Sequence, residues 1–204
     1  MDQQVNGHVI LAQSQYDTYD HWRNFALTHG VNFDGWYGNQ CWDLPALLWY
    51  QYGLSLVTKP GGNGVAYQCW TISRYINGRT PFTSIDGVSN IKRGDCLVFG
   101  SSSIAGTGHI CFADSDYSGR YWDARYGCWR LNCLGQNQGQ GVGWGAPSNV
   151  VGLNLAGFLG IFRNTRWASA PPPPTPTPTG ADKKSKYPWV LYSGKLRKNR
   201  SIVL

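Results

Sequence analysis

A run of prolines near the C-terminus limits what this chain can fold into. Residues 168–182 contain six of its eleven prolines, interleaved with threonine, and neither a helix nor a central strand accommodates such a run. The run predicts a stiff, extended linker. The 204 residues therefore divide into a domain of ordinary size, residues 1–167, the linker, and residues 183–204, which are too few to bury a core.

The basic residues are concentrated beyond the prolines. Residues 171–204 contain seven lysines and arginines against one aspartate, whereas residues 1–170 contain eleven against ten. The net charge of +7 is thus mostly a property of a basic tail, and it gives no reason to expect nucleic acid as a partner of the domain. The sequence has no apolar run of transmembrane length and begins without a signal-peptide pattern. We expect a monomer made in the cytoplasm, without membrane insertion.

The apolar pattern changes along the domain. Residues Gln13–His29, Cys41–Gly53 and 65–76 have helical spacing, ended by glycine or asparagine. From residue 95 onwards, short apolar runs between glycine-containing turns predict strands. These runs are Asp95–Phe99, His109–Ala113, Arg120–Arg125, Trp129–Gln136 and Phe158–Arg163. Helices followed by a meandering antiparallel sheet predict an α+β fold, with the N-terminal helices packed on the sheet.

Cys41 stands where we expect the second helix to begin. A thiol at a helix N-terminus lies against unpaired backbone N–H groups and the positive end of the helix dipole, which favours the thiolate. A thiolate is a nucleophile, so this position predicts covalent catalysis. Of the other cysteines, Cys96 and Cys111 lie in apolar strands and should be core residues, while Cys128 and Cys133 could pair in an oxidising compartment.

The loop before Cys41 has the alternating spacing of a calcium-binding loop. Asn32, Asp34 and Asp43 would contribute side-chain oxygens, and Trp36 and Gly38 would contribute backbone carbonyls. Because an asparagine replaces one acid and an aspartate replaces the longer closing glutamate, we expect weak binding of a structural Ca²⁺. The alternative is an ordinary polar turn rich in Asn, Asp and Gly.

A nucleophilic cysteine needs a base, and four histidines are available. His8 lies in an N-terminal arm, and His21 and His29 lie on the first helix, where a partly exposed or capping role is expected. His109 begins a strand after Gly-Thr-Gly, from which its ring can reach a cleft. We predict that His109 takes the Cys41 proton and returns it to the leaving amine.

A family resemblance rests on four segments: Asn32–Leu44, Arg93–Phe99, Gly108–Ile110 and Gly157–Arg163. Together they resemble the CHAP family, the cysteine, histidine-dependent amidohydrolases and peptidases, and are most similar to the CHAP domains of bacteriophage endolysins. The resemblance covers roughly residues 13–163. It implies a papain-like, NlpC/P60-like fold, with Cys41 as nucleophile, His109 as base and calcium at the loop.

The family's third catalytic motif is Glu-Gln-Asn, and the matching residues here are Gly135, Gln136 and Asn137. All eleven acids of the chain are aspartates, so the glutamate is lost. Asn137 would accept a hydrogen bond from the imidazole and hold its ring. The alternative is Asp123, on a strand predicted to pair with that of His109. We favour Asn137.

What the resemblance implies is a phage endolysin that hydrolyses Gram-positive peptidoglycan after another factor has let it through the membrane. The bond is an amide, either N-acetylmuramoyl–L-alanine or a peptide bond of the stem or cross-bridge. Residues 183–204 would be a basic tail that attracts anionic wall polymers, or the start of a truncated cell-wall-binding domain. Two alternatives stay open, namely a non-catalytic cell-wall-binding module and a bacterial autolysin.

Overall fold

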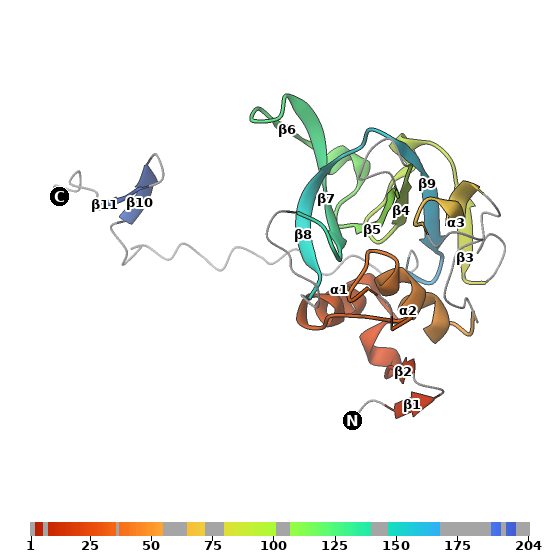
Figure 1. Cartoon of the computed structure of the whole chain (residues 1–204). Helices are drawn as coiled ribbons and strands as arrows, with labels where there is room; N and C mark the ends of the chain where they lie inside the picture. The colour runs from red at the N-terminus through yellow and green to blue at the C-terminus, as the bar shows by residue number, and fades with distance from the viewer. Residues whose placement is uncertain are drawn as a thin grey trace. The chain divides into compact units, whose positions relative to one another are not determined.

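The computed structural model describes residues 3–5, 8–35, 37–54, 65–71, 80–100, 107–139, 147–167, 189–192 and 195–198. The chain divides into two compact units, Met1–Ala170 and Pro171–Leu204 (Figure 1). In the second unit, β10 (Trp189–Tyr192) and β11 (Lys195–Lys198) pair as an antiparallel hairpin. The predicted linker and most of the predicted tail lie outside the described residues.

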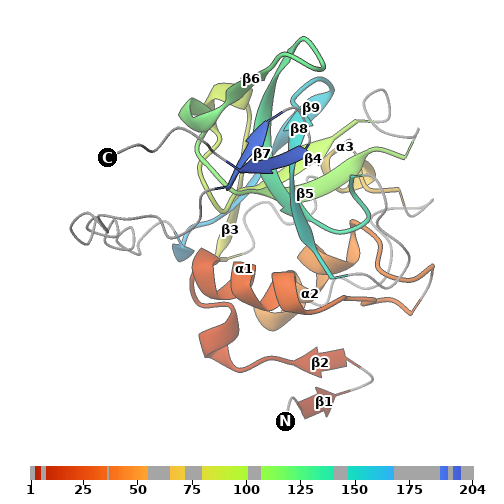
Figure 2. The same cartoon turned by 90° about the vertical axis from the view of Figure 1, so that its left-hand side faces the viewer.

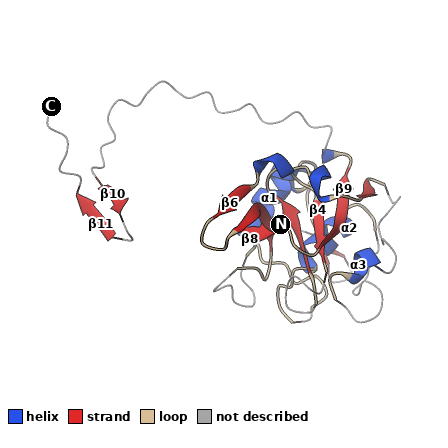
Figure 3. Ribbon diagram, turned by 90° about the horizontal axis from the view of Figure 1, so that it is seen from above, coloured by secondary structure: helices blue, strands red, loops and turns tan. Residues whose placement is uncertain are grey.

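The first unit combines helices with antiparallel strands (Figure 3). Its helices are α1 (Tyr19–Thr28), α2 (Asp43–Gln51) and the single turn α3 (Gln68–Thr71), with 3₁₀ turns η1 (Gln13–Gln15), η2 (Val88–Asn90) and η3 (Tyr117–Gly119). Its strands are β1 (Gln3–Val5), β2 (His8–Ile10), β3 (Phe82–Ile85), β4 (Cys96–Phe99), β5 (His109–Ala113), β6 (Tyr121–Asp123), β7 (Cys128–Gly135), β8 (Asn149–Asn154) and β9 (Phe158–Asn164). The predicted α+β class is confirmed.

One antiparallel sheet of seven strands forms the centre of this unit. Its order is β3-β9-β4-β5-β7-β6, and β8 also pairs with β7. Side chains alternate between the two faces, and each face has its own core. Val98 and Ile110 pack in the cluster that contains α1 and α2, whereas Leu97, Phe99 and Ile161 belong to a second cluster. β5 is therefore packed on both faces, through Ile110 and Phe112 on one and Cys111 and Ala113 on the other.

α1 begins later than the helical spacing from Gln13 predicts. The side chain of Thr18 accepts a hydrogen bond from the N–H of His21 at 3.1 Å and caps the helix there. Trp22 faces inward, and its ring meets that of Phe112 on β5 edge to face, with 6.1 Å between the centroids. α1 therefore packs against β5, the strand that begins at His109.

α2 is buried along nearly its whole length. Pro45 lies in its first turn, where a backbone N–H is not needed, so the helix is not interrupted. Trp49 packs edge to face on Phe162 of β9, at 6.0 Å between centroids. Figures 1 and 2 show α1 and α2 side by side at the same end of the sheet. This packing places the residues just before α2, Cys41 among them, close to the sheet.

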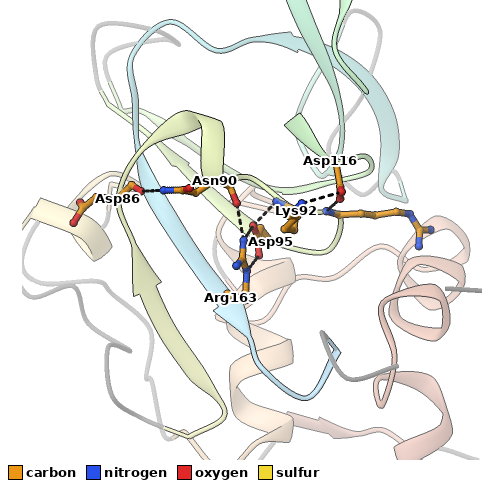
Figure 4. A network of polar contacts seen from close by, with 7 residues as sticks. Asp86, Asn90, Lys92, Asp95, Asp116 and Arg163 are labelled. Carbon is orange, nitrogen blue, oxygen red and sulfur yellow. Dashed lines mark hydrogen bonds and ion pairs between the residues drawn. The ribbon is translucent and has the colours of Figure 1, made fainter. Parts of the chain in front are cut away.

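A polar network joins β9 to the turn before β4 (Figure 4). Arg163 donates to both carboxylate oxygens of Asp95, at 2.8 and 2.7 Å, and to the carbonyl of Asn90 at 2.7 Å. Asp95 also accepts the N–H of Lys92 at 2.7 Å and is only 2% exposed. A buried carboxylate satisfied in this way is structural. Asp95 is therefore not a candidate for the catalytic site.

All six cysteines are free thiols. Cys96 and Cys111 are buried in the core, as predicted. Cys128 and Cys133 lie five residues apart on β7, on opposite faces of the strand and about 16 Å apart at the usual rise. The structure therefore rules out the disulfide that their spacing left open.

Candidate active site

The turn that carries Cys41 is braced by Asp43, the first residue of α2. The buried carboxylate of Asp43 accepts the backbone N–H of Gln40 at 2.7 Å, of Phe33 at 3.0 Å and of Asp34 at 3.4 Å. These bonds fold the loop back onto the start of the helix. Cys41 is thereby held in a fixed turn immediately before α2.

Cys41 lies against the start of β5, because its sulfur accepts a hydrogen bond from the backbone N–H of Ile110. Ala113 bonds through its backbone toward β4, so by alternation Ile110 turns its N–H toward β7. β5 pairs with β7 only at Phe112 and Ala113, which leaves this N–H unused by the sheet. The sulfur thus occupies the point where β5 and β7 diverge, beside the residue that follows His109.

The sequence predicts a resting thiolate at Cys41, but in the structure the thiol keeps its proton at neutral pH. Burial raises its pKa to about 11, and the charge of Asp43 acts in the same direction, against the N–H groups of Ile110, Trp42 and Cys41 itself. The residue is partly exposed, but its sulfur is surrounded by protein atoms. In addition, α2 begins at Asp43, so the thiol lies two residues ahead of the helix. The expectation of a resting thiolate is therefore wrong, because desolvation outweighs the N–H groups.

His109 is the first residue of β5 and follows Gly108, whose φ is +72°. A Cβ at Gly108 would collide with the carbonyl oxygen of Phe99, so the chain can enter β5 this way only without a side chain there. The imidazole is 2% exposed, and its Nε2 lies 2.9 Å from Oε1 of Gln138. Strand and glycine together fix where the ring sits.

Gln138 selects the tautomer of His109. The amide nitrogen of Gln138 donates to the carbonyls of Cys133 at 2.9 Å and Asn149 at 3.0 Å, so its Oε1 is the acceptor that faces the ring. Nε2 of His109 therefore carries the proton and Nδ1 carries the lone pair. Burial lowers the pKa of His109, although the bond to Gln138 acts to raise it, so the ring is neutral at pH 7. A neutral imidazole with a defined lone pair is the form that accepts a proton.

Three consecutive amides connect the two halves of the site. Gln136, fully buried, donates to the carbonyls of Val31 at 2.9 Å and Gln40 at 3.0 Å and accepts the N–H of Val31 at 2.7 Å. Asn137 donates to the side chain of Gln40 at 3.0 Å. The first two amides thus hold the residues before Cys41, and the third, on Gln138, holds the histidine.

The amide that meets the imidazole belongs to Gln138, one residue after the predicted Asn137. Asn137 has a left-handed backbone, with φ of +50°, and its side chain bonds to Gln40 while the next residue, Gln138, meets His109. The alternative, Asp123 on β6, accepts from Arg130 at 2.9 Å, while the imidazole bonds to Gln138. Asparagine tolerates the left-handed region more than most residues, and this is the signal that a turn begins here.

The predicted calcium loop has donors of suitable chemistry. The charge of Asp34 adds to burial in raising the pKa of Asp43 to about 7, so the two carboxylates share one environment. Oδ2 of Asp43 accepts a single N–H and retains a lone pair. Asn32 is exposed, Gly38 has φ of +71°, and Trp36 lies outside the described residues. Nowhere in the described part do three or more His, Cys, Asp or Glu cluster, so a metal here would also need amide and carbonyl oxygens, as calcium does.

No protein-family model matches the chain, and a search of the curated proteins finds no match. Among solved structures, the chain is similar to the crystal structure of a wild-type endolysin, LysIME-EF1, with 23% sequence identity and a TM-score of 0.49. The alignment covers 72% of this chain and 63% of that one, so the chain spans less than two thirds of that endolysin's length. Within the described residues, no helix has both the length and the apolarity needed to cross a bilayer.

Proposed function

We propose that this protein is a peptidoglycan hydrolase that cleaves an amide bond, with Cys41 as nucleophile and His109 as general base. One observation carries the proposal: the sulfur of Cys41 accepts the N–H of Ile110, while the neighbouring His109 is held by Gln138 with its Nδ1 lone pair available. The proposal is supported by where these residues stand in the fold: Cys41 precedes α2, His109 begins β5 next to the residue that donates to the sulfur, and Gln138 follows β7. The resemblance of residues 13–163 to the CHAP domains of phage endolysins, with their papain-like fold, supplies the substrate class.

The thiol and the imidazole begin as a neutral pair. As the sulfur of Cys41 attacks the carbonyl carbon, Nδ1 of His109 takes the thiol proton, and Nε2–H continues to donate to Gln138. The tetrahedral intermediate then expels the amine, which receives the proton from Nδ1, and a thioester remains on Cys41. Water, deprotonated by the same nitrogen, hydrolyses the thioester to the free acid and restores the thiol.

Charge on the substrate oxygen develops next to backbone donors. The N–H groups of Cys41 and Trp42 lie against the sulfur, and we place the oxyanion beside them. Because the pKa of the thiol is about 11, sulfur attack and proton transfer must occur together rather than from a preformed thiolate–imidazolium pair. The alignment of His109 by Gln138 is therefore a condition of every turnover.

We also propose that residues 32–43 bind a calcium ion weakly. Asn32, Asp34 and Asp43 would supply side-chain oxygens, and Trp36 and Gly38 would supply backbone carbonyls. Bound there, calcium would neutralise the two carboxylates and stiffen the turn that presents Cys41. The ion has no part in bond cleavage in this proposal.

Two chemically equivalent bonds suit the site, the N-acetylmuramoyl–L-alanine amide and a peptide bond of the stem or cross-bridge. A bacterial autolysin would use the same residues. The non-catalytic wall-binding module is less well supported, because an inert module does not need a buried imidazole in a selected tautomer. The basic residues of 183–204 would attract anionic wall polymers.

The test is clearing of a suspension of Gram-positive cell walls by the purified chain. We expect Cys41→Ser and His109→Ala to abolish clearing while wall binding persists, and mass spectrometry of the digest to identify the bond from the new end groups. Cys128→Ser, a partly buried thiol elsewhere, is the matched control and should clear like the wild type. Clearing by Cys41→Ser at the wild-type rate would overturn Cys41 as the nucleophile, whereas wall binding without clearing by the wild type would favour the binding-module alternative.

A further inference from the structure

The exposed aromatic residues of the first unit are concentrated on one hairpin, β6–β7. Five large hydrophobic side chains are exposed among the described residues, and all but Tyr37 lie here: Tyr121 (39%), Trp122 (54%), Tyr126 (53%) and Trp129 (52%). In Figures 1 and 2 the hairpin stands at the end of the sheet opposite α1 and α2. Aromatic side chains gathered on a projecting hairpin contribute little to the core, and such surfaces mark binding sites.

The rings are held in a defined arrangement. Trp122 and Trp129 face each other across the two strands, with 5.9 Å between centroids and 72° between ring planes. The guanidinium of Arg120 lies 3.4 Å from the ring centroid of Tyr117 and 5.6 Å from that of Trp129. Stacking of this kind restricts a flexible arginine and thereby prepares it to bind.

A groove of about 840 Å³ lies beside these residues. Its lining includes Tyr117, Arg120 and Trp129 together with residues 154–159, from the end of β8 to the start of β9. Nη1 of Arg120 is buried and has no hydrogen-bond acceptor among the described residues. Arg120 as a whole is half-buried, so part of its guanidinium is open to the groove. The groove therefore combines an apolar stacking surface with a cationic donor that two aromatic rings hold in place.

We propose that this groove binds the glycan strand of the cell-wall polymer, with the exposed ring of Trp129 stacking on a sugar and Arg120 donating to an acetamido or carboxylate oxygen. The C–H face of a pyranose is apolar and matches an indole ring, whereas its substituents need polar partners. The inference rests on the proposed function, which makes a saccharide the substrate. Single-stranded nucleic acid also stacks on aromatic rings, but it requires a strongly positive groove, and residues 1–170 carry a net charge of only +1.

The groove and the reaction site lie at opposite ends of β7. Trp129 and Gly135 are six residues apart on that strand, which corresponds to about 20 Å. Gly135 is next to the reactive end, since a Cβ there would come within 2.7 Å of Oε1 of Gln138. A ligand that reaches both places must be a polymer. The groove would hold the glycan while a peptide branch reaches Cys41, which raises the effective concentration of the scissile bond.

The experiment measures co-sedimentation of the full chain, carrying Cys41→Ser, with insoluble peptidoglycan freed of teichoic acids. Adding Trp129→Ala or Arg120→Ala should weaken binding about tenfold, the scale expected for one stacked ring or one charged hydrogen bond. Arg166→Ala removes an exposed arginine elsewhere and should leave binding unchanged. Trp129→Phe keeps a ring and should bind between the wild type and Trp129→Ala. Unchanged binding by Trp129→Ala and Arg120→Ala overturns the proposal, as does displacement of the chain by single-stranded DNA but not by solubilised glycan.

A second measurement separates this inference from the proposed function. With Cys41 intact, hydrolysis of a small soluble muropeptide that lacks a glycan strand should be the same for Trp129→Ala and the wild type. An equal loss on this small substrate would assign Trp129 a structural role and overturn the glycan site. If the wild type itself fails to cleave the muropeptide and cell walls, the proposed function fails, while the sedimentation result still decides whether the groove binds glycan.

Discussion

Replacing Gln138 tests the tautomer argument, because this side chain makes three hydrogen bonds and one of them is to His109. In Gln138→Ala, Nε2 of His109 loses its acceptor at 2.9 Å, and the carbonyls of Cys133 and Asn149 lose their donors. The imidazole can then adopt either tautomer and rotate, so that its lone pair is no longer reserved on Nδ1. Asn137→Ala removes a neighbouring amide whose side chain donates to that of Gln40.

The size of the effect follows from the bond that is lost. A buried hydrogen bond whose partner is left unsatisfied is worth about 1–3 kcal/mol, which corresponds to a decrease of about 5- to 150-fold in kcat. Asn137→Ala should lower kcat by no more than a few fold, and Asp123→Ala should leave it unchanged. Thermal midpoints measured alongside would show whether the Gln138 variant remains folded at the assay temperature.

The pH profile separates an orienting role from a merely structural one. In Gln138→Glu the acceptor is kept but carries a charge, which favours the protonated imidazole and raises the pKa of His109. The acid limb of kcat/KM should therefore move to higher pH in Gln138→Glu, with no such movement in Asn137→Asp. Wild-type turnover by Gln138→Ala together with inactive Asn137→Ala would refute this reasoning and restore the original assignment of Asn137.

Four further predictions concern single residues. Because burial lowers the pKa of His109 and the base must be neutral, the wild-type acid limb should lie below pH 6.5, and a limb above that value would contradict the buried environment of the ring. Calcium should raise the thermal midpoint more at pH 8 than at pH 6, because Asp43, with a pKa of about 7, must lose its proton to bind the ion. Asp34→Asn should reduce this rise. No change in the thermal midpoint with calcium at pH 8 would rule out the metal site. In calcium-free protein the same raised pKa makes the Asp43 contribution to stability fall as pH rises from about 4 to 7, because the folded carboxyl holds its proton more tightly than the unfolded one. Finally, Gly108→Ala should destabilise the fold by about 2 kcal/mol or more, because the new Cβ clashes with the carbonyl oxygen of Phe99. Gly127 has a similar positive φ but open space around it, so Gly127→Ala should cost about 1 kcal/mol. Equal thermal midpoints for the two variants would contradict the clash.

The predicted runs match β4, β5, β7 and β9 within about two residues, and the exposed β6 lies inside its predicted run. β4 and β5 are buried, continuous apolar runs, whereas β7 alternates over its first half and β6 is bounded by turns. β8 is not predicted from the sequence. It is half-buried and has a glycine in its middle, so its apolar residues form neither a continuous run nor a clean alternation with polar ones. β3 is short and mostly half-buried, and it lies at the sheet edge, where pairing with β9 decides the conformation.

The residue types of the proposed site can be named from the sequence, but their electrostatics and partners cannot. Cys41 and His109 are proposed from local sequence, and in the structure the sulfur of Cys41 accepts from Ile110, the residue after His109. The thiol pKa could not be predicted, since a helix N-terminus is visible in sequence but the burial that opposes it is a product of tertiary packing. Asn137 has a left-handed backbone, which the strand pattern does not predict, and the amide that meets His109 is that of the next residue, Gln138.

Detection of an acyl intermediate on Cys41 is the most direct test of the proposed chemistry. The chain would be mixed with soluble peptidoglycan fragments, quenched in acid within the first turnovers, digested and examined by mass spectrometry for an adduct on the peptide that contains Cys41. We predict a thioester-linked wall fragment on that peptide, lost in Cys41→Ser and in His109→Ala. Rapid amide cleavage that leaves Cys41 unmodified, or an adduct on another cysteine, would contradict the account.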